Sequence, residues 1–164
     1  MTEGDIIAVL YRENRKKVKY ILPNIFYYGG WEADCLIINK NLSTVEYEIK
    51  CDRKDWSAEF IDKKEKHICL SKKENCANKY CFICPEGLIT KEEVPEYAGL
   101  YYITSDLRLR IIKRPPLLNM DKIDLCTLVD KLYYRFDKCM SNDFNTRLTK
   151  GMKQKGKNIR LRKK

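Results

Sequence analysis

Residues 31–50 read WEADCLIINKNLSTVEYEIK, and this stretch decides the fold. It contains two short runs rich in apolar and β-branched residues, Ala33 to Asn39 and Thr44 to Lys50, separated by the polar residues Lys40 to Ser43. Two such runs with a four-residue connection are typical of antiparallel strands joined as a hairpin. We therefore predict a β-hairpin here and expect the rest of the chain to be built around it.

The segments on either side of the hairpin predict alternating helices and strands. Thr2 can cap a first helix that ends near Asn14, and a second helix is expected from about Asp55 through Leu70. Further strands are expected at 20–28, 80–84, 100–104 and 107–113, and a last helix at 122–140 whose buried face would consist of Leu125, Val129, Leu132, Phe136 and Cys139. This order predicts a single α/β domain, residues 1–146, with a central mixed sheet flanked by helices.

The composition of the 164 residues is that of a globular protein, with 44% hydrophobic and 34% charged residues. No apolar run approaches the ~20 residues that a membrane-spanning helix requires. The first residues, MTEGDII, lack the basic and apolar regions of a secretory signal. We therefore expect a cytoplasmic protein without a membrane partner.

The positive charge is concentrated at the end of the chain. Lys and Arg number 33 against 23 Asp and Glu, and residues 147–164 are rich in Lys and Arg and contain no acidic residue. Such a tail can bind a nucleic-acid backbone by releasing counterions, whereas the alternative is a tail that only aids solubility. The candidate DNA contacts in this basic tail are Arg147, Lys150, Lys153, Arg160 and Arg162.

Charged residues alternate with apolar ones along the hairpin. Alternate residues of a strand share a face, so Glu32 lies with Asp34, and Glu46 and Glu48 lie with Lys50. Carboxylates brought this close repel each other unless a positive charge lies between them, and Mg²⁺ with its oxygen ligands suits that position. Beside the metal, Lys50 would position or deprotonate a water molecule. The alternative is a sheet face whose charges point into solvent.

The spacing of these residues resembles a known motif. Asp34 followed by Glu48-Ile49-Lys50 resembles the D…(D/E)xK motif of the PD-(D/E)XK, or restriction-endonuclease-like, nuclease superfamily. A longer string of segments resembles the MmcB-like, often phage-borne, branch of that superfamily. These segments are WEADCLII, EYEIKCDRKDW, Asp62-Lys63, Lys66-His67, YCFICPEGLI, EEVPEYAGLYYI and KRPPLL, which together span roughly residues 30–118.

The resemblance implies a restriction-endonuclease-like fold and a DNA endonuclease or exonuclease that depends on Mg²⁺ or Mn²⁺, acting in DNA repair or phage DNA metabolism. By this resemblance Asp34, Glu48 and the carbonyl of Ile49 bind the metal, with Glu32 as the added upstream acid, and Lys50 serves the attacking water. Glu3 and Glu13 are weaker candidates for the upstream acid. Asp34, Glu48 and Lys50 are thus the expected catalytic residues.

The sequence departs from the branch just after the motif. The branch usually has a small hydroxyl residue two positions after the lysine, where this chain has Asp52. Asp52 would then either add a metal ligand or cap the following helix. The next residues match again, and Arg53 among them is a candidate DNA contact. Lys63 and His67, one helical turn apart, are candidates for holding a phosphate or leaving group, although a single histidine on an apolar face is more often a core residue.

Two other functions remain open at this point. The first is a DNA-binding accessory protein with the same fold and no catalytic activity. The second is a zinc-stabilised module built from His67, Cys69, Cys76, Cys81 and Cys84. Cys81 and Cys84 argue against zinc, because residues three apart on a strand point to opposite faces.

Overall fold

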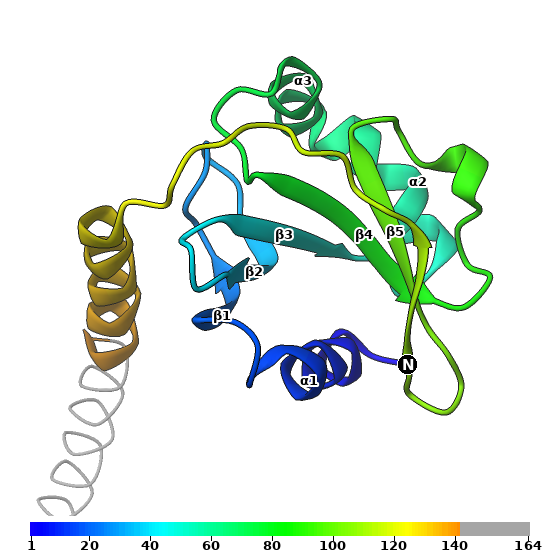
Figure 1. Cartoon of the computed structure of the whole chain (residues 1–164), viewed down its shortest axis with the longest axis horizontal. Helices are drawn as coiled ribbons and strands as arrows, with labels where there is room; N and C mark the ends of the chain where they lie inside the picture. The colour runs from blue at the N-terminus through cyan, green and yellow to red at the C-terminus, as the bar shows by residue number, and fades with distance from the viewer. Residues whose placement is uncertain (142–164) are drawn as a thin grey trace, which may run out of the picture. The chain divides into compact units, whose positions relative to one another are not determined.

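The computed structural model describes residues 1–141, which belong to two compact units, residues 1–124 and 125–164. In the first unit a six-stranded sheet forms the centre, and three helices flank it (Figure 1). Among the described residues, no helix is long and apolar enough to cross a membrane. The predicted α/β class with a central mixed sheet is confirmed.

The strands follow one another across the sheet in chain order. They are β1 (Tyr20–Ile25), β2 (Ala33–Ile38), β3 (Thr44–Ile49), β4 (Lys79–Pro85), β5 (Ala98–Ile103) and β6 (Leu109–Lys113). The predicted hairpin is present, because β2 and β3 pair antiparallel with Cys35 opposite Tyr47. β3, β4 and β5 run parallel to one another, which makes the sheet mixed. The helical crossover between β3 and β4 carries half of the charged site described below.

The helices cover the two faces of the sheet separately. α1 (Glu3–Asn14) packs on one face through Ile6 and Leu10, and its N-terminus is capped by Thr2 as predicted. α2 (Arg53–Asp62) and α3 (Lys64–Lys72) lie on the other face (Figure 1). The cysteines of β4 divide between the two cores: Cys81 packs with the α1 side and Cys84 with the α2 side. They therefore cannot share a zinc ion.

The predicted second helix is interrupted. Lys63 has φ −112° and ψ 31°, which are not helical angles, so α2 ends and α3 begins at this residue. The apolar spacing through Trp56 and Leu70 continues across the break, and both side chains are buried in the same core. Periodicity therefore identified the buried face correctly, but it could not detect a change in helix direction.

The C-terminal helix is present, and its predicted buried face is wrong at three of five positions, since only Leu125 and Leu132 are partly buried. Residues 125–141 are helical, yet Val129 and Phe136 are each 61% exposed and Cys139 is exposed. An amphipathic repeat shows that one side of a helix is apolar, and it does not supply a neighbour to cover that side. The predicted basic tail, residues 147–164, lies outside the described residues.

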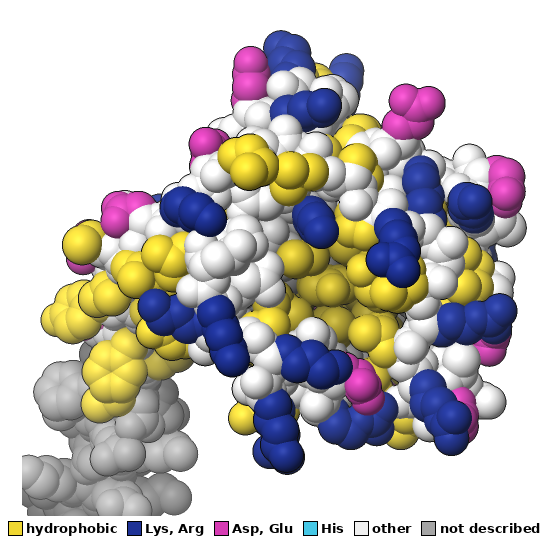
Figure 2. Space-filling view, viewed as in Figure 1, with side chains coloured by type: hydrophobic (Ala, Val, Ile, Leu, Met, Phe, Trp, Pro, Cys, Tyr) yellow, Lys and Arg dark blue, Asp and Glu magenta, His cyan; other side chains and the backbone are white. Residues whose placement is uncertain are grey.

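A hollow of about 320 Å³ lies on the α1 face of the first unit. Apolar side chains are visible between α1 and the sheet in Figure 2, and Lys and Arg side chains surround them. Tyr47 and Tyr101 line the hollow together with Lys79 and Arg114. This face therefore combines aromatic and cationic groups.

Asn78, just before β4, ties the sheet to the segment that follows β6. Its buried side chain accepts a hydrogen bond from the Thr44 amide at 2.6 Å and donates to Asn119 Oδ1 at 2.7 Å and to the Asp121 carbonyl at 2.9 Å. Thr44 begins β3, which carries the charged site. The Asn78 amide thus holds the start of that strand in place.

We expect Asn78→Ala to lower the free energy of unfolding by about 1–3 kcal/mol, because buried polar groups lose their partner. Asn41→Ala, whose side chain bonds only to Ser43 within an exposed loop, is the control and should cost less than about 1 kcal/mol. Urea denaturation measures both values. Equal costs for the two variants would contradict this role of Asn78.

Candidate functional site

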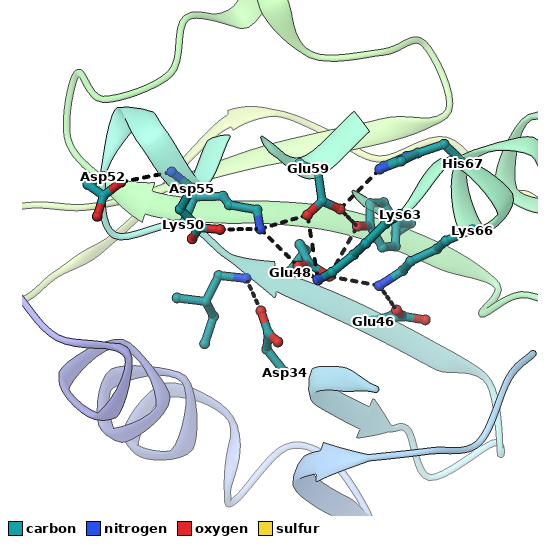
Figure 3. A network of polar contacts seen from close by, with 12 residues as sticks. Asp34, Glu46, Glu48, Lys50, Asp52, Asp55, Glu59, Lys63, Lys66 and His67 are labelled. Atoms are coloured by element: carbon teal, nitrogen blue, oxygen red, sulfur yellow. Dashed lines mark hydrogen bonds and ion pairs between the residues drawn. The ribbon is translucent and has the colours of Figure 1, made fainter. Parts of the chain in front are cut away.

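The charged residues of β2 and β3 lie, with Lys50, in a largely buried cluster on the α2 face of the sheet (Figure 3). β3 contributes Glu46 and Glu48, and Lys50 follows it directly. α2 and α3, with the junction between them, contribute one acid and further bases, namely Glu59, Lys63, Lys66 and His67. The alternative of a sheet face open to solvent is wrong, because Glu46, Glu48 and Lys50 are at most 2% exposed.

Glu48 is the centre of this cluster, and three ammonium groups surround it. Its Oε1 pairs with Lys50 at 3.1 Å and, more closely, with Lys63, while its Oε2 lies 2.7 Å from Lys66. Burial acts to raise the pKa of Glu48, but the three lysines outweigh burial and keep the pKa below its ordinary value. Glu48 is therefore ionised despite being fully buried.

Lys50 is held by three carboxylates. Its ammonium lies 2.7 Å from Glu59, 3.0 Å from Asp55 and 3.1 Å from Glu48. Burial acts to lower the pKa of Lys50, but Glu48 and Glu59 outweigh it and raise the pKa above its ordinary value. An ammonium has three N–H donors, of which two form hydrogen bonds, to Glu48 and to Asp55, while Glu59 is ion-paired without a hydrogen bond. Lys50 is thus a permanent cation.

Lys66 is the most deeply buried cation of the cluster. It pairs with Glu46 and Glu48, each at 2.7 Å, and its ammonium lies 5.0 Å from the centre of the Tyr80 ring. Burial acts to lower the pKa of Lys66, but the two glutamates raise it above the ordinary value. Lys66 therefore compensates the charge of β3 from the opposite helix.

Asp34 is joined to this cluster through the backbone of β3. Its Oδ2 accepts a hydrogen bond of 2.7 Å from the amide of Ile49, between Glu48 and Lys50. Burial and, to a smaller extent, the nearby charge of Glu48 raise the pKa of Asp34 to about 7, although the Ile49 hydrogen bond opposes both. Asp34 and the Glu48-Ile49-Lys50 motif are therefore together in space, as the hairpin register requires.

His67 lies in the same core but has both ring nitrogens occupied. Nε2 lies 3.0 Å from Glu59 and Nδ1 lies 2.7 Å from the hydroxyl of Tyr97. Because His67 is buried, its geometry suits holding Glu59 in place better than holding a phosphate. The interpretation of His67 as a satisfied core residue thus fits its contacts.

Other predicted site residues lie outside the cluster. Glu32 is exposed before β2, and no ion pair or hydrogen bond in residues 1–141 joins it to Asp34 or Glu48. Asp52 caps α2 by accepting a hydrogen bond of 2.8 Å from the Asp55 amide, which settles its role in favour of a cap. Arg53 pairs with Glu93 at 2.6 Å. The candidates from Arg147 to Arg162 lie beyond the described residues.

Cluster members that were not predicted as site residues include Asp55, Glu59, Lys66 and Tyr80. Glu59 and Lys66 lie seven residues apart, at helical spacing from Lys63, so their pattern alone resembles a solvated helix face. One feature of the sequence could have identified them: the charged positions 59, 63 and 66 fall on the same helical face as the apolar positions 56 and 70. A charged stripe within an apolar face indicates buried partners on the sheet.

A hollow opens beside this cluster at the junction of α2 and α3. Its volume is about 520 Å³, and Lys63 and Lys66 line it together with Gly30 and Trp31 from the connection before β2. Lys63 is 31% exposed at this opening, whereas Lys50 and Lys66 are buried. Lys63 is therefore the most exposed of the three lysines around Glu48, and it lies at this hollow.

The cluster contains carboxylate oxygens, which are the type of ligand that a hard divalent cation prefers. Asp34 and Glu48 provide oxygen ligands, and Glu46 Oε1 and Glu59 Oε2 are ion-paired but accept no hydrogen bond. Within residues 1–141, no group of three or more His, Cys, Asp or Glu side chains is spaced to hold a metal ion. Mg²⁺ needs only one or two carboxylates, with water and phosphate completing its shell. The residues fit such an ion once an ammonium leaves Glu48.

Comparisons with known proteins bear on the fold alone. No protein-family model matches this chain, and no curated protein matches it. The structure of the SPO1766 protein of unknown function from Silicibacter pomeroyi is similar, with a TM-score of 0.59 and 15% sequence identity, over 85% of this chain and 90% of that chain. At this identity the similarity supports a shared α/β architecture.

We expect Lys66→Met to lower the free energy of unfolding by about 3–5 kcal/mol, because it leaves Glu46 buried without its ion-pair partner and removes one of the three cations around Glu48. Lys64→Met, an exposed neighbour on the same helix, is the control and should change stability by less than about 0.5 kcal/mol. Guanidinium denaturation measures both. A cost below about 1 kcal/mol for Lys66→Met would contradict the charge compensation described here.

The raised pKa of Asp34 predicts a pH dependence of stability. Its ordinary pKa is 3.8 and its folded pKa is about 7, so the folded protein binds this proton more tightly than the unfolded chain. Its contribution to the free energy of unfolding therefore falls as pH rises through this interval and is constant above it. Asp34→Asn should accordingly gain stability relative to the wild type as pH rises.

Denaturation in EDTA at a series of pH values between about 4 and 8 measures this difference, since that range spans both pKa values. The asparagine side chain of the variant can still accept the hydrogen bond of the Ile49 amide, so the comparison isolates the charge. Parallel stability curves for the two proteins would show that the pKa of Asp34 is not raised.

Proposed function

We propose that this chain is a metal-dependent DNA nuclease of the restriction-endonuclease-like type. The observation that carries the proposal is that Asp34 lies with the Glu48-Ile49-Lys50 motif in a cluster whose Lys63 and Lys66 line a hollow. The resemblance of the motif and of residues 30–118 to the PD-(D/E)XK superfamily supports it. We propose DNA repair or phage DNA metabolism in the cytoplasm as its setting.

In this proposal Asp34, Glu48 and the carbonyl of Ile49 hold Mg²⁺ or Mn²⁺. When bound, the ion supplies Lewis-acid stabilisation of a phosphate oxygen and a water of lowered pKa. The amide of Ile49 fixes the orientation of Asp34, because it donates to Oδ2. Glu59 and Asp55 fix the ammonium of Lys50 beside Glu48.

Lys50 acts as a positioned cation in this site and not as a base. Its raised pKa keeps it protonated at neutral pH, so it has no lone pair with which to remove a proton from water. It can orient a water molecule or stabilise negative charge with the N–H that forms no hydrogen bond to Glu59, or with one that Glu48 or Asp55 releases. Of the two roles expected from the sequence, the geometry favours positioning.

A second candidate is a DNA-binding accessory protein without catalytic activity. It is favoured by the complete pairing of the lysines of the cluster, which resembles a structural ion-pair network. The cationic groups around the hollow on the α1 face, Lys79 and Arg114, would then contribute to binding. Such a protein would bind DNA in a salt-sensitive manner that does not depend on Mg²⁺.

A cleavage assay separates the two candidates. Plasmid and single-stranded DNA are incubated with wild type, Asp34→Asn and the control Glu32→Gln, in Mg²⁺, Mn²⁺ or EDTA. We expect Asp34→Asn to lower the cleavage rate by at least about a hundredfold, since a metal site contributes several kcal/mol to the transition state. Glu32→Gln should stay close to wild type, because Glu32 lies outside the cluster.

Lys50→Met in the same assay tests the positioned cation, with circular dichroism confirming that the variant is folded. Cleavage that continues in EDTA, or that Asp34→Asn leaves unchanged, would contradict the proposed site. DNA binding without cleavage under every condition would favour the accessory protein.

A further inference from the structure

The three lysines around Glu48 are not equivalent. The side chains of Lys50 and Lys66 are 3% and 1% exposed, whereas that of Lys63 is 31% exposed. Lys50 is held by three carboxylates and Lys66 by two at 2.7 Å. Lys63 has one close partner, Glu48, and a second at 3.5 Å, Glu59. Lys63 is therefore the least restrained of the three.

The backbone also gives Lys63 freedom that the other two lack. Lys63 lies where α2 ends and α3 begins, outside either helix. It lines the hollow of about 520 Å³, so its side chain has room to turn toward solvent. Lys66 also lines the hollow, but its side chain is 1% exposed and is held by two carboxylates, and Lys50, which is 3% exposed, does not line it (Figure 3).

The charge of the cluster explains why Lys63 occupies Glu48. Three buried carboxyl groups, those of Glu46, Glu48 and Glu59, face two buried ammonium groups; burial raises the pKa of Glu46, whereas the lysines keep the pKa of Glu48 low. An isolated buried carboxylate is costly, and Lys63 supplies the third positive charge. Any cation that reached Glu48 through the hollow would make this charge unnecessary.

We infer that Lys63 is an internal counterion that leaves Glu48 when a divalent cation binds there, and that its freed ammonium then faces anionic ligands in the hollow. This inference rests on the proposed function, because it takes Asp34 and Glu48 as the cation ligands. It assigns Lys63 two alternating partners, a carboxylate in the cation-free protein and a phosphate oxygen in the loaded one. Lys64, which also lines the hollow, has no such alternation.

Calorimetric titration with MnCl₂ alone tests the competition for Glu48. Lys63→Met should bind Mn²⁺ at least about tenfold more tightly than wild type, because the wild type is competent only in the fraction of molecules whose Lys63 has left Glu48. Lys64→Met removes the same charge from the adjacent exposed residue and should leave the affinity close to that of wild type. Equal affinities of the Lys63 and Lys64 variants would overturn the inference.

Acetylation of the wild-type protein tests the movement without any substitution in the cluster. Lysines are acetylated briefly with and without saturating MnCl₂, and each site is quantified by mass spectrometry. We expect the acetylation rate of Lys63 to rise on addition of Mn²⁺ while that of Lys64 is unchanged. This measurement does not require that the Lys63→Met variant folds.

The outcomes separate this inference from the proposed function. Binding of Mn²⁺ that Asp34→Asn abolishes, with Lys63 remaining as protected as before, would overturn the role of Lys63 and leave the cation site in place. Failure of both wild type and Lys63→Met to bind Mn²⁺ would overturn the cation site and the inference together. Binding by Lys63→Met alone would support Lys63 as the competing cation.

Discussion

The charged site depends on one buried ionic contact, the carboxylate of Glu48 surrounded by the ammonium groups of Lys50, Lys63 and Lys66. Glu48 projects from the centre of the sheet toward the face whose core contains Trp56 and Leu70. Removing a carboxylate from water without compensation is strongly unfavourable, so the helices of the crossover must bring positive charge to it. The position of α2 and α3 is thereby linked to the charge pattern of β3.

This arrangement connects stability with chemistry. The ion pairs that allow Glu48 to be buried also keep Lys50 protonated. Glu59 and Asp55 hold the ammonium group of Lys50 in its position. They fill the space in which a cation would lie, so the site as described is neutralised by its own side chains. One of those side chains, Lys63, is partly exposed beside the hollow. In our proposal it is the side chain that leaves Glu48 when a cation binds.

Much of the fold follows from local patterns in the sequence. The alternation in residues 33–49 and the polar connection between its halves determine the register of β2 and β3, and this register brings Asp34 to the amide of Ile49. The partners of Glu48 could not be derived in the same way. Glu59 and Lys66 are ordinary helical charges until the crossover places them over the sheet, which is a tertiary effect. The exposed side of the helix at 125–141 was missed for a related reason, because periodicity identifies an apolar side and not its neighbour.

A crystal of the protein soaked in MnCl₂, with anomalous scattering measured for manganese, tests the central claim most directly. The account predicts an anomalous peak between the carboxylates of Asp34 and Glu48, at about the 2.1 Å ligand distance of a hard divalent ion, with the Lys63 ammonium no longer on Glu48. A fully soaked crystal with no manganese at these carboxylates, and with Lys63 still paired to Glu48, would contradict it.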